Sequence, residues 1–217
     1  RLRVYAAMMR ALDRSVGQIN DTLIEEGLAD NTIVVFSSDN GGAGYIGLPG
    51  VNQPFRGWKL TNFEGGLRVP MFVKWPKKVA PGTRVSNPVA HIDLMPTLVA
   101  AADAKIPQDV ELDGVDILPL ATGDEGAAWD RKTLFWQSGY YRVVRHEDWK
   151  LQISDNPKKT WLFDLANDPT EQNNLATSEP EKLAELQALL AERKASARDP
   201  LYPFVAEMPV AVDKTLA

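Results

Sequence analysis

The feature that most constrains the fold is an amphipathic helical pattern followed directly by an apolar strand pattern. Apolar residues recur at three- and four-residue spacing, which predicts a helix with one buried stripe made of Tyr5, Met9, Leu12, Val16, Ile19 and Leu23. Gly27 is the expected stop of this helix. Residues 32–36 form a continuous β-branched and aromatic run, typical of a strand covered on both faces. A helix leading into such a strand predicts an α/β sheet.

The composition is that of an ordinary globular protein. The 217 residues include 24 basic and 29 acidic side chains, for a formal net charge of −5, and 44% are hydrophobic. This acidic balance argues against nucleic acid as the main partner. No apolar run approaches the roughly 18 residues of a membrane span. The absence of cysteine excludes disulfides, thiolate metal sites and a cysteine nucleophile within these residues.

Three further segments complete the first part of the chain. Residues 37–66 are rich in glycine and lack periodicity, which predicts a functional loop. A second strand is expected at residues 67–75, where Pro70 favours a sheet edge or a bulge. Residues 93–102 carry apolar side chains on one face and predict a short helix.

The character of the sequence changes after residues 123–130. Aromatic and β-branched residues between 133 and 153, with a polar break at 146–148, predict an antiparallel hairpin, and residues 161–165 predict another strand. Ser178 is expected to cap an amphipathic helix. We therefore predict a sheet domain over residues 1–128, a small antiparallel α+β unit over residues 129–199, and a tail over residues 200–217.

Two short patterns in the long loop carry chemistry. Asp39 and Asn40 follow the first strand, and ligands of open α/β sheets bind beyond the carboxyl ends of strands. Their oxygens are of the type that calcium or magnesium prefers, although a simple turn is the alternative. A lysine near such a cation requires an anion between the two positive charges, and a phosphate or sulfate group fits. Considered without the cation, Lys59 is most simply a solvated surface lysine.

The order of the motifs is more specific than any one of them. Residues 37–42 (Ser-Ser-Asp-Asn-Gly-Gly), 56–59 (Arg-Gly-Trp-Lys) and 63–70 (Phe-Glu-Gly-Gly-Leu-Arg-Val-Pro) closely resemble the C-terminal half of the arylsulfatase-like sulfatase family, in the alkaline phosphatase superfamily. The resemblance continues through residues 81–83, 91–97, 112–114 and 162–171, and so spans nearly the whole chain.

This resemblance implies a fold, an activity and site residues. The fold would be the C-terminal part of an alkaline-phosphatase-like α/β sheet domain, followed by the small antiparallel unit. Sulfatases hydrolyse sulfate esters with a divalent metal, usually calcium, and a formylglycine nucleophile; magnesium is also possible. By position, Asp39 and Asn40 match metal ligands and Lys59 matches a catalytic lysine that holds the sulfate. Arg56 matches a loop arginine expected near the substrate.

The chain also departs from the family pattern. It contains no Cys/Ser-x-Pro-x-Arg motif from which formylglycine could form. We therefore expect the nucleophile upstream, in an N-terminal part of the same protein, and expect the isolated chain to be inactive and to bind calcium poorly. His91 and His146 are the only histidines, and we expect structural or surface roles for both.

Two rival functions remain open at this point. A phosphatase, phosphodiesterase or phosphonate hydrolase of the same superfamily would share the metal and anion chemistry. A non-catalytic interaction module would account for the absent nucleophile. The family resemblance favours a periplasmic or secreted location, and a cytoplasmic one is not excluded.

Overall fold

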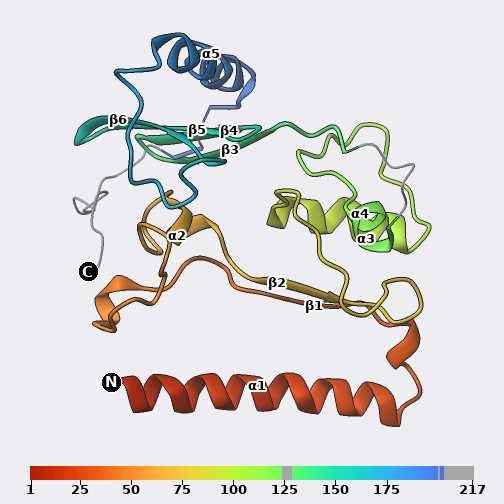
Figure 1. The fold of residues 1–217 in the computed structure, drawn as a ribbon. Coiled ribbons are helices and arrows are strands. Elements are labelled where there is room, and N and C mark those ends of the chain that lie inside the picture. Colours follow the sequence, from red (N-terminus) through yellow and green to blue (C-terminus); the bar gives the residue numbers. More distant parts are fainter. Residues whose placement is uncertain (124–128, 200, 203–217) are drawn as a thin grey trace. The chain divides into compact units, whose positions relative to one another are not determined.

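A computed structural model describes residues 1–123, 129–199 and 201–202 (Figure 1). The chain forms two compact units. Among the described residues, the sheet unit comprises residues 1–7, 37–71, 131–199 and 201–202, and the helical unit comprises residues 8–36, 72–123 and 129–130. The predicted limits after residues 128 and 199 stay a prediction. Apart from residues 201–202, the predicted tail 200–217 lies outside the described residues.

Helix α1 (Leu2–Glu25) confirms the first helical pattern, and its end follows from Gly27. Gly27 has a φ of 69° and donates its N–H to the carbonyl of Ile24, while Leu28 donates to Leu23. This pair of bonds is a Schellman motif, which needs a left-handed residue at the position of Gly27. Among the described helices, none is long and apolar enough to cross a membrane.

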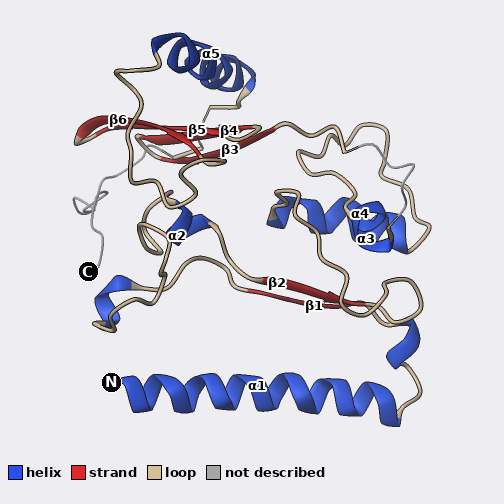
Figure 2. Ribbon diagram, viewed as in Figure 1, coloured by secondary structure: helices blue, strands red, loops and turns tan. Residues whose placement is uncertain are grey.

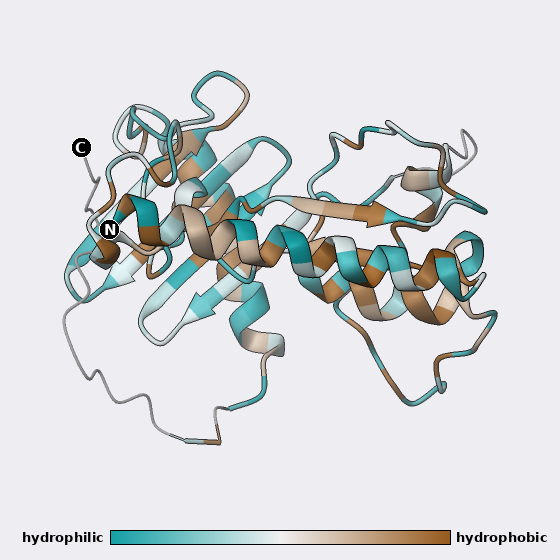
Figure 3. Ribbon diagram, turned by 90° about the horizontal axis from the view of Figure 1, so that it is seen from below, coloured by the Kyte–Doolittle hydropathy of each residue, from teal (hydrophilic) through white to brown (hydrophobic). Residues whose placement is uncertain are grey.

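The predicted burial of the α1 stripe is wrong. No residue of α1 is buried, and the side chain of Ile19 is 57% exposed, while only Val16 and Leu23 in the stripe are half-buried. Apolar and polar residues follow one another along α1 in Figure 3. A two-stranded ribbon is too narrow to cover such a helix, since adjacent strands lie only about 5 Å apart. The bond from Lys74 Nζ to Asn20 Oδ1 (2.7 Å) joins α1 to β2.

That ribbon pairs β1 (Val34–Ser37) with β2 (Met71–Lys74), after a short 3-10 turn at Ala29–Asn31. β1 is half-buried throughout and β2 mostly exposed, so the expected coverage of β1 on both faces is not found. The second strand begins later than predicted, because residues 64–67 form the short helix α2 (Glu64–Leu67). A 3-10 turn at Gly44–Ile46 is the other regular element of the long loop.

In the helical unit, α3 (Leu94–Ala101) confirms the predicted short helix, and α4 (Leu118–Thr122) was not predicted. Asp93 ends the preceding 3-10 turn (His91–Asp93) and is fully buried. Its carboxylate accepts the N–H groups of Ala90 (2.7 Å) and Val115 (3.1 Å). A Cβ added at Gly114 would lie 2.0 Å from the carbonyl oxygen of Ile92. The motifs at residues 91–97 and 112–114 therefore pack against each other.

The sheet unit is built on a four-stranded antiparallel sheet, in the order β3-β4-β5-β6 (Figure 2). Its strands are β3 (Thr133–Ser138), β4 (Tyr141–His146), β5 (Trp149–Asp155) and β6 (Lys158–Asp164). The polar break at 146–148 is the β4–β5 turn, as predicted. A further turn at residues 139–140 divides the predicted hairpin strands. This antiparallel sheet with its helix confirms the small antiparallel α+β unit predicted for the C-terminal part of the chain.

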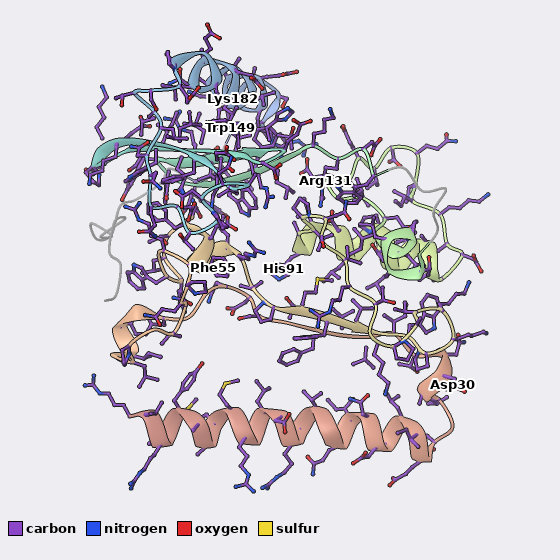
Figure 4. The ribbon with its side chains drawn as sticks, viewed as in Figure 1. Asp30, Phe55, His91, Arg131, Trp149 and Lys182 are labelled. Carbon is purple, nitrogen blue, oxygen red and sulfur yellow. The ribbon has the colours of Figure 1, made fainter. Side chains whose placement is uncertain are left out.

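Both faces of this sheet are covered. Helix α5 (Pro180–Ser196) packs Leu186 against Val144, Leu151 and Leu162 on one face. On the same side, Lys182 lies over the Trp149 ring at 5.8 Å (Figure 4). The expected Ser178 cap is wrong: Glu179 occupies the cap position, and the Ser178 hydroxyl donates to the carbonyl of Leu175.

The other face holds an aromatic cluster with the start of α2. Phe63 lies fully buried among Trp161 and Phe163, at ring-centroid distances of 5.4 and 6.1 Å. The loop before α2 is thus packed onto the sheet.

We predict that Leu186→Ala lowers the free energy of unfolding by about 2–5 kcal/mol, because it opens a cavity in a closed cluster. Urea denaturation measures the loss. Gln187→Ala, exposed on the same helix, is the control and should leave stability nearly unchanged. Equal stabilities of Leu186→Ala and the parent would contradict the packing of α5 on the sheet.

Candidate active site

Asp39 and Asn40 lie directly beyond β1, where the sequence predicted a ligand site. Asp39 is exposed, and within the described part of the chain its carboxylate has no hydrogen-bond or ion-pair partner. The Asn40 amide nitrogen donates to the carbonyl of Gly41 (3.0 Å). The Asn40 amide oxygen has no hydrogen-bond partner among the described residues. Both residues therefore offer oxygens of the kind that a hard cation takes.

Glycines pack this segment directly against the start of α2. Gly41 donates its N–H to the carbonyl of Gly66 (2.9 Å). A Cβ added at Gly41 would lie 1.8 Å from the carbonyl oxygen of Gly65, and one at Gly66 would lie 2.0 Å from that of Thr61. Backbones can approach this closely only where no side chain intervenes.

Asn52 fixes the next part of the loop and was missed by the sequence analysis. Its side-chain oxygen accepts the N–H of Gly42 (2.6 Å), and its amide nitrogen donates to the carbonyls of Gly42 (3.0 Å) and Gly57 (3.1 Å). One asparagine thus joins the Asp39–Asn40 segment to the segment that carries Lys59.

Lys59 is tied to the same place by its own backbone, since its N–H donates to the carbonyl of Gly42 (3.2 Å). Its half-buried side chain places the ammonium 5.8 Å from the ring centroid of Tyr45, which meets Trp58 edge to face. The ammonium makes no ion pair with the described residues. A cation held beside an aromatic face, without a carboxylate partner, is available to an anion.

Arg56 has structural contacts. Its guanidinium lies over the Phe63 ring at 4.4 Å, and Nη1 donates to the backbone carbonyl of Glu171 (2.8 Å). Its expected role near the substrate stays a prediction.

Beneath the loop lies a buried cluster of charges. The Lys150 ammonium lies 2.8 Å from Glu64 Oε1 and 2.9 Å from Glu171 Oε1, and all three residues are buried. Gln152 Nε2 donates to Glu171 Oε1 (3.0 Å), and the Tyr141 hydroxyl donates to the Gln152 oxygen. We call these five residues the buried network. It joins the loop to β4, β5 and the segment after β6.

Electrostatics distinguishes Glu171 within this network. Burial raises the pKa of the Glu171 carboxyl above its ordinary value, although the Lys150 ammonium and the Glu64 N–H act in the opposite direction. The charge of Glu64 raises this pKa further, because two carboxylates share one ammonium.

Two models of known protein families match this chain. The family model described as Sulfatase matches residues 1–104, and the model described as N-sulphoglucosamine sulphohydrolase, C-terminal, matches residues 57–199. The chain belongs to the sulfatase family. The resemblance inferred from the motifs is thereby confirmed.

Curated sulfatases are similar along most of the chain. Steryl-sulfatase of Homo sapiens is 34% identical over 178 residues, which is 78% of this chain and 30% of that protein. Arylsulfatase J of Mus musculus is 30% identical over 250 residues, covering 93% and 41% of the two chains. This sulfatase chain thus spans well under half the length of these relatives.

Solved structures share its fold. The crystal structure of Ps i-CgsB has a TM-score of 0.79 at 33% identity, over 92% of this chain and 44% of that one. BT4656 in complex with its substrate D-glucosamine-2-N,6-O-disulfate has a TM-score of 0.71 at 26% identity, over 88% and 40%. A phosphonate monoester hydrolase of Silicibacter pomeroyi, at 23% identity and a TM-score of 0.68, shares the fold alone.

The donor set of this sulfatase chain fits part of a metal site. Across residues 1–123, 129–199 and 201–202, no three His, Cys, Asp or Glu side chains gather as a cation site. Asp39 and Asn40 could supply about three oxygens, whereas calcium takes six to eight.

The histidines lie elsewhere. The His146 ring is 2.7 Å from the Thr133 hydroxyl across the β3–β4 pair, and His91 is exposed on its 3-10 turn. These positions agree with the structural or surface roles expected for them.

The buried network was the main omission of the sequence analysis. One signal was present: Lys150, Gln152 and Ser154 alternate along an otherwise apolar stretch. That spacing places three polar residues on one face of β5, where all three are buried. A lysine at such a position needs a carboxylate partner, but the sequence did not identify Glu64 and Glu171.

The raised pKa of Glu171 predicts how stability depends on pH. A raised pKa means that the folded state binds this proton more tightly, so the stabilisation is present below pH 4.5 and is lost as pH rises through the folded-state pKa. Relative to Glu171→Gln, which cannot titrate there, the parent should therefore lose stability as pH rises from 4.5. Urea unfolding at a series of pH values measures this difference.

Glu147→Gln is the control for that experiment. A hydrogen bond from Lys132 lowers the pKa of Glu147, so its small, solvent-screened contribution should change in the opposite direction with pH. A parent that gains stability relative to Glu171→Gln as pH rises from 4.5 would contradict the raised pKa.

Proposed function

We propose that this chain is part of an enzyme that hydrolyses sulfate esters, in which Asp39 and Asn40 bind a divalent cation and Lys59 binds the sulfate group. The observation that carries the proposal is the bond from the Lys59 N–H to the carbonyl of Gly42. This bond holds Lys59 against Gly42, which follows Asn40 closely in the chain. Among the described residues, neither the Lys59 ammonium nor the Asp39 carboxylate has an ion-pair partner. A cation and a lysine placed near one another are suited to hold an anionic group between them.

The cation is calcium, or magnesium in its place, and its other ligands come from residues outside this chain or from water. When bound, it neutralises negative charge on the sulfate group and orients the reacting atoms. Lys59 adds a positive charge at the oxygens where negative charge develops in the transition state. The Tyr45 face keeps that ammonium within the loop rather than extended into solvent.

The nucleophile lies outside this chain in the proposal. A formylglycine in the rest of the same protein is supported by family membership and by the absence of a suitable motif among the 217 residues. The isolated chain would then contact the cation and the sulfate group without catalysing hydrolysis. A periplasmic or secreted location is also proposed, with family membership as its support.

Lys59→Ala in the complete enzyme should lower kcat by roughly 30- to 1,000-fold, because a charge-assisted contact in the transition state is worth about 2–4 kcal/mol. The melting temperature should change little, since Lys59 makes no ion pair with the described residues. Lys59→Arg should restore the rate only in part, because a planar guanidinium does not superimpose on a compact ammonium. Steady-state kinetics with an aryl sulfate of low leaving-group pKa measures the effect.

Lys158→Ala, an exposed lysine at the start of β6, is the matched control and should retain the parent rate. A phosphonate monoester and a phosphate ester, assayed beside the sulfate, test the rival reaction. A near-normal rate for Lys59→Ala would show that Lys59 is only a solvated residue. Faster turnover of the phosphonate than of the sulfate would overturn the sulfatase assignment.

A further inference from the structure

We propose that Glu171 is a positioning residue for the sulfate-binding loop: with Lys150 it holds both ends of the segment that carries Lys59. This inference rests on the proposed role of Lys59 and extends it to residues that do not touch the substrate. It gives the buried network a positioning role, which is distinct from metal binding and from catalysis.

Glu171 contacts both ends of the segment from Arg56 to Glu64. At one end, its backbone carbonyl accepts a hydrogen bond from Arg56 Nη1 (2.8 Å). At the other end, its carboxylate oxygen Oε2 accepts the backbone N–H of Glu64. Lys59 lies between these two points in the sequence. A single residue, Glu171, therefore restrains both ends of this segment.

Contacts within the segment transmit this restraint to Lys59. Gly65 donates its N–H to the carbonyl of Arg56 (2.7 Å), which closes the segment into a loop. Thr61 and Trp58 are bonded to each other through the Thr61 hydroxyl (3.0 Å) and through their backbones (2.8 Å). The glycine contacts then lock this loop to the Asp39–Asn40 segment. Displacing Glu64 would therefore disturb the place where Lys59 meets the proposed cation site.

The backbone at Glu171 is unusual, and unlike the exposed Glu147 its side chain is fully buried. Glu171 has a φ of 59°, in the left-handed region that glycine or asparagine adopts at lower cost. The turn that carries it is itself well bonded: Glu171 donates its N–H to the carbonyl of Asp168 (3.1 Å), and the Asp168 carboxylate accepts the N–H of Asn173 (2.7 Å). A strained glutamate on a firm turn is well suited to act as a fixed anchor.

Stability alone does not account for this cluster. Two carboxylates and one ammonium leave an excess negative charge in a buried place, and apolar residues of similar volume often stabilise a fold as well or better. Directional bonds are what the charged residues add. Gln152 donates to the Glu171 carboxylate and is itself bonded by Tyr141, so the Glu171 carboxylate is held in one orientation.

The test uses the complete enzyme with Glu171→Gln, which keeps the shape but replaces one acceptor oxygen by a donor facing Lys150 or the Glu64 N–H. Hydrogen exchange read by mass spectrometry should show the peptides covering residues 57–66 exchanging at least about tenfold faster, without substrate present. In the same variant kcat for an aryl sulfate should fall by about tenfold or more, because small displacements of a catalytic group are costly.

Two controls separate positioning from general loss of stability. Glu147→Gln alters another lysine-paired glutamate, also at positive φ (53°) but exposed, and should leave both readouts unchanged. Leu186→Ala weakens the opposite face of the sheet and should lower the melting temperature without selectively accelerating residues 57–66. Tyr141→Phe removes only the hydroxyl that orients Gln152 and should give a smaller change in the same peptides. It serves as the test if Glu171→Gln does not fold.

The exchange readout does not depend on the reaction. If the parent itself fails to hydrolyse sulfate esters, the proposed function fails, and faster exchange of residues 57–66 in Glu171→Gln would still support the anchoring. Unchanged exchange in folded Glu171→Gln, or in folded Tyr141→Phe where it replaces that variant, would overturn the inference. Equal acceleration in Leu186→Ala would overturn it as well.

Discussion

Lys150 places one ammonium between two buried carboxylates, and much of the sheet unit depends on this arrangement. A lysine on a central strand cannot remain charged away from water without partners. Its partners come from distant parts of the chain, Glu64 at the start of α2 and Glu171 after β6. Satisfying one buried charge therefore requires the glycine-rich loop to lie on the sheet. The pairing of Lys150 with Glu64 and Glu171 therefore determines where the loop lies on the sheet.

The two faces of the sheet divide their tasks. On the α5 side, Leu151, Leu162 and Leu186 form an apolar cluster that stabilises the unit by burial. On the other side, the buried network and the aromatic cluster around Phe63 hold the loop in a defined place. Apolar packing supplies stability with little directional preference, whereas hydrogen bonds to charged groups fix orientation. The loop that carries Lys59 is attached to the side with the buried network.

The sequence predicts features that depend on neighbouring residues better than features that depend on contacts between residues far apart in the chain. The helix at residues 2–25 and its stop at Gly27 follow from local spacing and one left-handed residue. The burial of the α1 stripe could not be predicted, because it depends on what packs against the helix. Helix α2 was missed because two glycines argue locally against a helix. It is held by backbone N–H groups of Leu67 and Arg68, which donate to the carbonyls of Phe63 and Glu64. The motifs predict site roles for Asp39, Asn40 and Lys59, whereas the pairing of Lys150 with residues far away in sequence is indicated only by the polar alternation in β5.

The central claim is that one anchored loop brings Lys59 and the Asp39–Asn40 oxygens to the same bound anion and cation. The most direct measurement is a crystal structure of the complete enzyme with calcium and an unreactive sulfate analogue. The Lys59 ammonium should lie within about 3 Å of an analogue oxygen, and oxygens of Asp39 and Asn40 should lie about 2.3–2.6 Å from the calcium ion. An ammonium that remains over Tyr45, with calcium bound by other residues, would contradict it.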